Sequence, residues 1–377
     1  MYLGKVMVVF GTRPEAIKMA PVVKELQKVP DIHTVVTVTA QHREMLDQVL
    51  RLFEIQPDYD LNLMETRQDL FSITIGALSG LKEVLEKEKP DLVIVHGDTT
   101  TTLAASLAAF YMRIPVAHVE AGLRTRNKYS PFPEEMNRTL TGRLTELHFA
   151  PTDTSRENLL AEATAEFKIW VTGNTVIDAL LSIIKDDYQF GREFDGIDMS
   201  KRLILVTTHR RENWGERMRE IYQALLELVE EFPDIAVVFP VHKNPVVRSI
   251  AEEMLSGKPR IHLLEPLDYE PFAHLMNISY LVVTDSGGLQ EEAPALGKPV
   301  LVLRDTTERP EAVTAGTVKL VGTSRRKIYE ETKKLLSDPR EYDKMARAIN
   351  PYGDGKAARR IVRELISFLY VRIGAQV

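Results

Sequence analysis

The sequence lacks cysteine, a large excess of charge of one sign and any long apolar run. The absence of cysteine from 377 residues excludes disulfides, thiolate nucleophiles and zinc–thiolate sites. The formal net charge of -6 gives no basic surface for nucleic acid, so an anionic ligand needs a local cluster of cations. No apolar stretch approaches the roughly 18 residues of a transmembrane helix, and the first residues lack a signal-peptide pattern. We therefore expect a cytoplasmic protein that binds neither nucleic acid nor membrane.

Several motifs of common enzyme classes are also missing. The histidines do not have the spacing of a zinc-binding helix, and no Gly-x-Ser-x-Gly elbow occurs. Gly11-Thr12-Arg13 lacks the later glycines of a dinucleotide fingerprint, and no Gly-Lys-Ser/Thr follows Ser286-Gly287-Gly288. We predict chemistry that uses no metal, no covalent nucleophile and no cofactor.

What the sequence does contain is a regular alternation of short β-branched apolar runs and longer helical patterns. Continuous apolar strands separated by helices are typical of parallel sheets covered on both faces. A chain of 377 residues is also about the length of two domains. The predicted strands are Val6–Phe10, Thr34–Thr39, Leu92–His96, Val116–Val119, Leu147–Ala150, Leu203–Thr207, Ala236–Phe239, Ile261–Leu264, Tyr280–Thr284 and Val300–Leu303.

We predict an α/β protein of two doubly wound, Rossmann-like domains that face a cleft. The first domain covers residues 1–172 and the second covers residues 173–352. Residues 353–377 form a final helix that returns to the first domain.

Polar residues directly follow the predicted strands, where ligands bind in open parallel sheets. Turn chemistry accounts for Gly, Asn, Asp and Pro at such places, but not for repeated Arg, His and Glu. The polar segments are Gly11–Glu15, His96–Thr100, Glu120–Arg124, Thr207–Asn213, Pro240–His242 and Asp285–Gly288. We expect them to surround one cleft.

Ser286-Gly287-Gly288 is the best candidate for a phosphate site. Small residues at the start of a helix leave backbone N–H groups and the positive end of the helix dipole open to an anion. The alternative is an ordinary helix cap. Glu291 and Glu292 follow in the first turns of the same helix. Both could simply interact with the helix dipole, or one of them could accept hydrogen bonds from ribose hydroxyls. Arg309 could complete a diphosphate site.

Asp98, Glu120 and Glu134 are suited to acid–base chemistry, which needs titratable groups within hydrogen-bond reach of a substrate proton. Asp98 could instead belong to a simple turn, and Glu134 could be only an acid in the first turn of a helix. His209 precedes three charged residues, which favours a solvated cleft over a core position.

The order of these motifs closely resembles that of the bacterial non-hydrolysing UDP-N-acetylglucosamine 2-epimerases over essentially the whole chain. The motifs that carry the resemblance are GTRPEAIKMAP, TAQHREML, VHGDTTTT, HVEAGLRT, YSPFPEEMNR, VTGNTVIDAL, TTHRRENWGE, PVHKNP, DSGGLQEEAP, GKPVLVLRDTTERPE and NPYGDGKA, from Gly11 to Ala357.

The resemblance implies the B-type glycosyltransferase fold and the interconversion of UDP-N-acetylglucosamine and UDP-N-acetylmannosamine for cell-envelope polysaccharide synthesis. The implied mechanism eliminates UDP to leave a bound 2-acetamidoglucal and then adds UDP back. A homodimer and a second UDP-N-acetylglucosamine acting as an activator are also implied.

The motif match also assigns residues to roles. Asp98, Glu120 and Glu134 become acid–base candidates, with His209 beside the diphosphate, and Leu267 and Phe272 beside the uracil. Glu292 falls on the ribose position. The remaining substrate contacts are Arg13, Lys18, Arg138, Ser286, Gly287, Gly288 and Arg309. The activator site maps onto Gln41, His42, Glu44, Arg67, Arg210, Arg211 and His242. Relatives often have Gln at the position of Glu44, whose negative charge would weaken phosphate binding.

Three alternatives share parts of this pattern. A glycosyltransferase of the same fold would move the sugar to an acceptor, although the first half holds more carboxylates than that reaction needs. A hydrolysing epimerase would release UDP to water and often carries a kinase domain, for which this chain is too short. A non-catalytic nucleotide-sugar sensor would bind without turnover.

Overall fold

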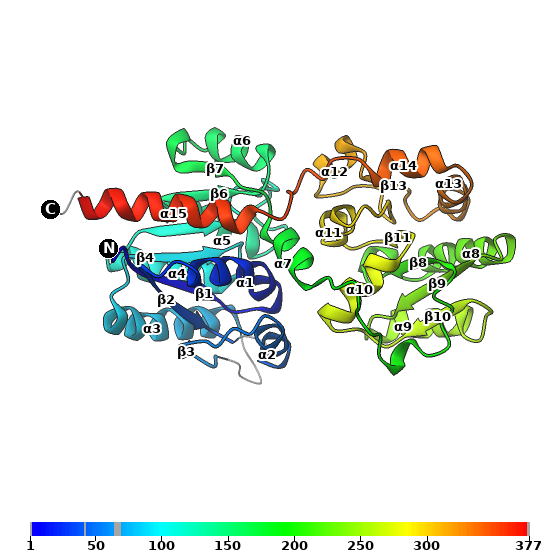
Figure 1. Cartoon of the computed structure of the whole chain (residues 1–377), viewed down its shortest axis with the longest axis horizontal. Coiled ribbons are helices and arrows are strands. Elements are labelled where there is room, and N and C mark those ends of the chain that lie inside the picture. The colour runs from blue at the N-terminus through cyan, green and yellow to red at the C-terminus, as the bar shows by residue number, and fades with distance from the viewer. Residues whose placement is uncertain (1, 41–42, 64–68, 375–377) are drawn as a thin grey trace. The chain divides into compact units, whose positions relative to one another are not determined.

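The computed structural model describes residues 2–40, 43–63 and 69–374 (Figure 1). The chain forms two compact units, each with its own sheet. The first unit comprises Met1–Ala179 and Tyr352–Val377, and the second comprises Leu180–Pro351.

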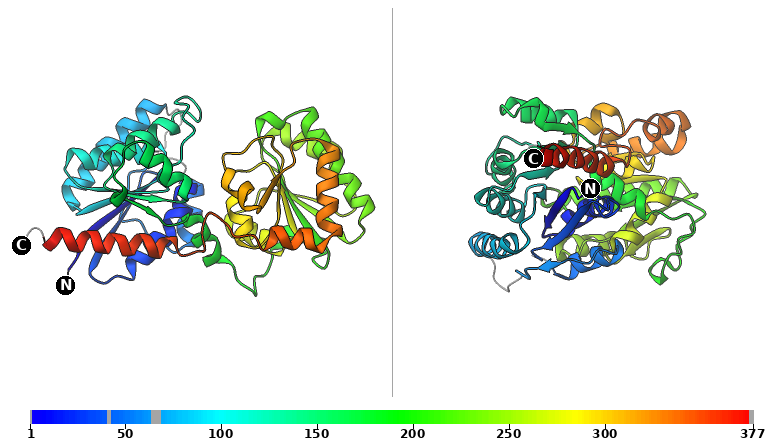
Figure 2. Two further views of the ribbon diagram at one scale, coloured as in Figure 1. Left: turned by 90° about the horizontal axis from the view of Figure 1, so that it is seen from above. Right: turned by 60° about the vertical axis from the view of Figure 1, so that its left-hand side comes forward.

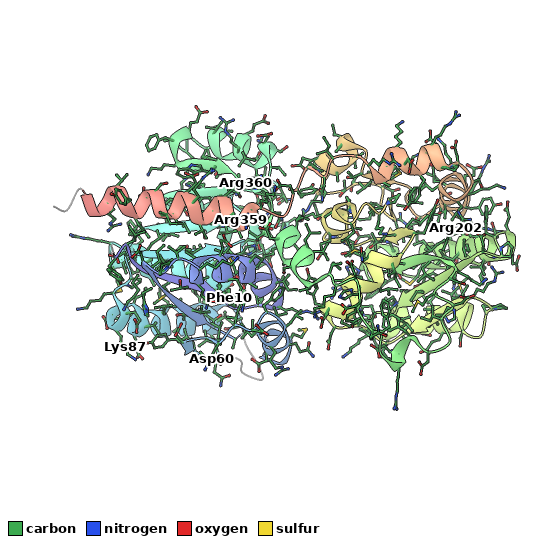
Figure 3. All side chains as sticks on the ribbon, viewed as in Figure 1. Phe10, Asp60, Lys87, Arg202, Arg359 and Arg360 are labelled. Carbon is green, nitrogen blue, oxygen red and sulfur yellow. The ribbon has the colours of Figure 1, made fainter. Side chains whose placement is uncertain are left out.

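The first unit is built on a seven-stranded parallel sheet of order β3-β2-β1-β4-β5-β6-β7. Its strands are β1 (Gly4–Phe10), β2 (Ile32–Val38), β3 (Tyr59–Asp60), β4 (Leu92–His96), β5 (Val116–Val119), β6 (Leu147–Ala150) and β7 (Ile169–Val171). The central strands β4 and β5 are buried along their whole length, as expected for a parallel sheet with both faces covered. Phe10, at the end of β1, is fully buried (Figure 3).

Helices cover both faces of this sheet (Figure 2). Buried residues of α3 (Leu70–Glu88) and α4 (Thr100–Tyr111) pack on one face, and α15 (Ala357–Gly374) packs against α1 (Arg13–Gln27). The other helices are α2 (Arg43–Leu52), α5 (Glu134–Leu144), α6 (Asp153–Ala161) and α7 (Thr175–Ile183), which runs into the second unit. The predicted return of the C-terminal helix to the first domain is confirmed.

The second unit has a six-stranded parallel sheet of order β10-β9-β8-β11-β12-β13. Its strands are β8 (Arg202–Thr207), β9 (Ile235–Pro240), β10 (Ile261–Leu264), β11 (Leu281–Thr284), β12 (Val300–Val302) and β13 (Val318–Leu320). Its helices are α8 (Glu216–Glu231), α9 (Pro245–Leu255), α10 (Tyr269–Ile278), α11 (Leu289–Ala295), α12 (Pro310–Ala315), α13 (Arg325–Ser337) and α14 (Pro339–Ala346). The core lies between β8, β9, β11 and β12 and the helices α8, α9 and α13.

Both sheets are doubly wound, which confirms the predicted fold class. The strand order reverses between β1 and β4 in the first unit, and between β8 and β11 in the second. Ligands in such sheets bind beyond the strand ends at the reversal, so these two places locate the candidate sites. Within the described ranges, no helix combines the length and apolar character needed to cross a membrane.

Candidate functional site

Glu120 is the centre of a polar cluster in the first unit. It directly follows β5 and has φ of 61°, a left-handed conformation that is unusual for a residue with a side chain. Its Oε2 makes an ion pair with Lys18 of α1 and accepts a hydrogen bond of 2.8 Å from Asn174 Nδ2. Oε2 also lies 3.8 Å from His96 Nε2. The strand end therefore presents a carboxylate that Lys18 and Asn174, from two different segments, hold in place.

Asp98 lies two residues beyond β4, next to this cluster. Its carboxylate is 3.7 Å from Arg138 of α5, and its backbone oxygen accepts a 2.9 Å hydrogen bond from Asn137. Burial raises the pKa of Asp98 to about 6, against the opposing effect of the Arg138 charge; the charge of Glu120 raises it further. A carboxyl group with such a pKa can exchange a proton near neutral pH.

Two buried histidines support the same strand ends. Burial lowers the pKa of His96 to about 4 and that of His118 to about 3, so both rings are neutral at pH 7. The His118 ring hydrogen-bonds through Nε2 to the backbone oxygen of Gly97, at 2.7 Å. This bond fixes the turn that carries Asp98.

The neighbouring residues Glu134 and Glu135 differ in environment. Glu134 begins α5, is half-buried, and its negative charge contributes to the raised pKa of Asp98. Glu135 is buried, and its carboxylate accepts the N–H groups of Thr125 and Arg126 and pairs with Arg138 at 3.2 Å. Glu134 thus belongs with the acid–base candidates, whereas Glu135 holds a loop.

Glu15 is a buried carboxylate that the sequence pattern did not single out. It accepts the N–H groups of Gly11 and Thr12 and the hydroxyl of Thr99, at 3.0, 2.8 and 2.8 Å. Burial raises its pKa, and these hydrogen bonds oppose the rise. Glu15 thereby joins the start of α1, where the half-buried Arg13 lies, to the loop that carries Asp98.

In the second unit, the buried carboxylate of Asp285 organises the loop after β8. It accepts the backbone N–H groups of His209 and Arg210 at 3.0 Å each and the side-chain amide of Asn213 at 3.1 Å. His209 Nδ1 lies 2.9 Å from Asp285 Oδ1. Burial opposes ionisation of Asp285, but these donors outweigh it and hold the pKa below the ordinary value. His209 is therefore fixed, with its side chain 39% exposed.

The Ser286-Gly287-Gly288 segment lies between β11 and α11, at the reversal of the second sheet. The Ser286 N–H donates to Thr284 Oγ1 at 2.9 Å, and Ser286 O accepts from Gln290 at 3.0 Å. A Cβ placed on Gly287 would lie 3.8 Å from Arg210 Nη2. Two carboxylates border the same space, because Glu308 Oε2 would lie 4.0 Å from that Cβ and Glu292 Oε2 would lie 3.6 Å from a Cβ on Gly288. The small residues thus leave room between one cation and two carboxylates.

The residues predicted for ribose and diphosphate have defined partners. Arg309 makes an ion pair with Glu291, which is buried. Glu292 is half-buried and accepts a hydrogen bond of 3.2 Å from Tyr269. Leu267 precedes α10, Phe272 lies on it, and both are half-buried in the second unit.

Only part of the predicted activator site can be placed. Gln41, His42 and Arg67 lie outside the described residues, as does the side chain of Glu44. Arg211 is exposed over the ring of Trp214, and the exposed His242 ring stacks at 5.9 Å from that of His209. Arg210 lies 3.7 Å from Glu308.

Comparisons with known proteins agree with this arrangement. A family model described as UDP-N-acetylglucosamine 2-epimerase matches residues 24–366. A UDP-N-acetylglucosamine 2-epimerase of Bacillus subtilis is 59% identical and covers 96% of this chain and 95% of its own. A Listeria monocytogenes structure is similar with a TM-score of 0.92 and 53% identity, covering 97% of this chain and 96% of its own. The structure of the Neisseria meningitidis UDP-GlcNAc 2-epimerase bound to UDP-GlcNAc is similar with a TM-score of 0.86 and 56% identity. The match covers 96% of this chain and 100% of that chain.

A glycotransferase of kitacinnamycin is similar at 13% identity with a TM-score of 0.66, which shows the fold alone. Fold and polar clusters together define an α/β enzyme with the architecture of the B-type glycosyltransferases. Within that class, the chain belongs to the UDP-N-acetylglucosamine 2-epimerase family, whose members are isomerases.

Proposed function

We propose that the chain interconverts UDP-N-acetylglucosamine and UDP-N-acetylmannosamine by eliminating and re-adding UDP. The observation that carries this proposal is the Asp98–Glu120 cluster, because inversion at carbon 2 requires groups that remove and return a proton. Its second support is the family membership, with identity above 50% over nearly the whole chain.

In the first step, a carboxylate among Asp98, Glu120 and Glu134 takes the proton from carbon 2. The C1–O bond breaks, its electron pair leaves with UDP, and a C1=C2 double bond remains in 2-acetamidoglucal. In the second step, the UDP oxygen adds back to carbon 1 and an acid delivers a proton to the opposite face of carbon 2. Because that hydrogen is weakly acidic, stabilisation of the departing UDP has to lower much of the barrier.

The second unit would supply that stabilisation. We assign the diphosphate to the Ser286-Gly287-Gly288 segment, together with His209, which Asp285 orients. Glu292 would bind the ribose, and Leu267 and Phe272 the uracil. Arg13, Lys18, Arg138 and Arg309 would act as cations near the substrate. The ion pairs of Lys18 with Glu120 and of Arg309 with Glu291 imply that these cations also orient carboxylates.

A homodimer, an activating second UDP-N-acetylglucosamine and a cytoplasmic location remain predictions from the family resemblance. For the activator, Arg210, Arg211 and His242 are the candidates within the described residues.

Incubation with UDP-N-acetylglucosamine in deuterium oxide, followed by NMR at carbon 2, tests the proposal. We expect both epimers to appear with deuterium at carbon 2, and Glu120→Gln to bind UDP while incorporating little label. A sugar that stays unlabelled and unepimerised would reject the proposal. Transfer of the sugar to an added acceptor would favour a glycosyltransferase, and binding without turnover would favour a sensor.

A further inference from the structure

Asn174 uses both ends of its side chain, and each end has a different partner. Its Nδ2 donates to Glu120 Oε2 at 2.8 Å, and its Oδ1 accepts the N–H of Val176 at 3.1 Å. The amide orientation follows from these partners, because a backbone N–H requires an acceptor and a carboxylate requires a donor. Asn174 directly precedes α7, so the second bond is an N-capping bond. The first bond has no such local purpose, since it joins residues 54 positions apart.

Asn174 also lies where the chain passes between its two units for the first time, beside the segment where it returns. The backbone N–H of Asn174 donates to Tyr352 O at 2.7 Å. A Cβ on Gly173 would lie 3.2 Å from both Gly353 Cα and Tyr352 O, so the two segments touch through glycine. Both glycines have positive φ, 89° and 126°, which a larger residue would adopt only with strain.

Two further contacts complete this junction. Asp178 of α7 accepts the N–H groups of Ala357 and Ala358, at 3.1 and 2.8 Å, and so caps α15. Arg360 of α15, labelled in Figure 3, donates to Thr172 O at 3.0 Å and pairs with Asp354 at 2.8 Å. We call this set of contacts, all within the first unit, the crossover clamp. It leaves the Asn174 backbone little freedom to move.

We propose that Asn174 is a positioning residue for Glu120: its amide sets the orientation of the carboxylate, and the crossover clamp sets the amide. Lys18 reaches the same oxygen from α1 and supplies charge, but its long side chain has several rotatable bonds. The short, clamped amide supplies the direction. The inference rests on the proposed role of Glu120 in the reaction.

Two substitutions separate positioning from capping. Asn174→Ser keeps an oxygen that can cap α7 but is too short to reach Glu120. Asn174→Asp keeps the capping oxygen and the shape, but it removes the donor and places a like charge beside Glu120. We expect both to lower kcat by about 10- to 100-fold, because small errors in placing a reacting group are costly. KM for UDP-N-acetylglucosamine should stay within about threefold and UDP binding should be retained. A kcat within twofold of wild type in both variants would overturn the inference.

Asp178→Asn is the matched control, because it exchanges Asp and Asn in the same junction, away from Glu120, and leaves an oxygen that can still cap α15 and keep the crossover clamp closed. It should keep the wild-type kcat; an equal loss of kcat would mean that the junction as a whole, and not the bond to Glu120, controls the rate. In a double-mutant cycle, Asn174→Ser should have almost no effect when Glu120 is already Ala. Additive losses would overturn the inference.

The same set of variants separates this inference from the proposed function. If Glu120→Ala alone retains wild-type activity, the proposed role of Glu120 fails. If Glu120→Ala is inactive while Asn174→Ser and Asn174→Asp are fully active, only the role of Asn174 fails.

Discussion

At the scale of single residues, Asp98 has the environment that best fits proton transfer at neutral pH. Burial raises its pKa to about 6, and Arg138 at 3.7 Å keeps it from rising further. The ionisation of Asp98 therefore falls within the working pH range of an enzyme.

Replacing Asp98 by Asn should lower kcat/KM by about 10²-fold or more while leaving UDP binding intact, because the amide cannot exchange the proton. In the wild type, the pH profile of kcat/KM should show an ionisation near pH 6, and this ionisation should be missing from the residual activity of Asp98→Asn. The exposed Asp153→Asn makes the same change of charge elsewhere and should behave as wild type. Full activity in Asp98→Asn would remove this residue from the mechanism.

The same substitution should change how the stability of the fold depends on pH. A raised folded-state pKa means that the contribution of Asp98 to stability is complete below about pH 4 and is lost as the pH rises through about 6. The Asn side chain does not titrate, so the variant does not share this loss. The free energy of unfolding of Asp98→Asn, relative to that of the wild type, should therefore increase between pH 4 and pH 7. Two pKa units set an upper limit of about 3 kcal/mol. Urea unfolding of both proteins at pH 4 and pH 7 measures this change. The same difference in free energy of unfolding between variant and wild type at the two pH values would contradict the raised pKa.

The sequence identified Asp98, Glu120 and Glu134 because each is a titratable carboxyl group near a strand end or helix start, although a turn or the first turn of a helix also accounts for Asp98 and Glu134. The structure places Asp98 beside Glu120 and close enough to Glu134 for that charge to affect its pKa. Glu15 and Asn174 escaped notice because each looks locally like a helix-start residue. Their partners, Thr99 and Glu120, are distant in the sequence, so only the folded chain reveals the contacts.

At the scale of elements, the loop after β8 depends on the side chain of Asp285, which directly follows β11. Asp285→Asn would replace one accepting oxygen by an NH2 group, which would face the N–H groups of the loop instead of accepting from them. We expect a loss of about 3 kcal/mol in the free energy of unfolding, because buried N–H groups lose their acceptor. UDP affinity should fall at least about tenfold as His209 loses its orientation. The exposed Asp268, which makes no capping hydrogen bond, provides the control Asp268→Asn.

Calorimetry and UDP titration of both variants decide this point. The wild type should also lose the Asp285 contribution as the pH falls below the ordinary pKa of aspartate, because its folded-state pKa is depressed. A stable Asp285→Asn variant with normal UDP affinity would show that the loop is held in another way.

The C-terminal helix α15 contributes core residues to the first unit. Leu365 is fully buried, whereas Arg363 on the same helix is exposed. Leu365→Ala should therefore lower the free energy of unfolding by about 2–4 kcal/mol through lost burial and a residual cavity. Arg363→Ala should change it by less than about 0.5 kcal/mol. Equal effects in urea unfolding would contradict the packing of α15 against α1.

Most elements of the fold follow from local pattern. β4, β5, β6 and β10 have the predicted bounds, because each is a short run of apolar residues with a single histidine, set between polar turns. The edge strands β3, β7 and β13 were not predicted. They have only two or three residues each, and pairing with a neighbouring strand, not local sequence, defines them.

At the scale of the whole molecule, we propose that the first unit transfers the proton and that the second stabilises the departing UDP. Sequence patterns located the polar segments at the ends of the strands that flank the two sheet reversals and of their neighbours β5 and β9, because doubly wound sheets bind ligands beyond these ends. They could not identify the crossover clamp, because it forms between residues 172–178 and 352–360, nearly 200 positions apart.

The central proposal is that loss of the carbon 2 proton is linked to loss of UDP from carbon 1. The most direct measurement is positional isotope exchange, with 18O placed in the oxygen that bridges carbon 1 and the β-phosphate, in deuterium oxide. We predict that 18O moves into the non-bridging β-phosphate positions while deuterium enters carbon 2, and that Asp98→Asn and Glu120→Gln slow both together. Deuterium at carbon 2 with all 18O still in the bridge would contradict the account.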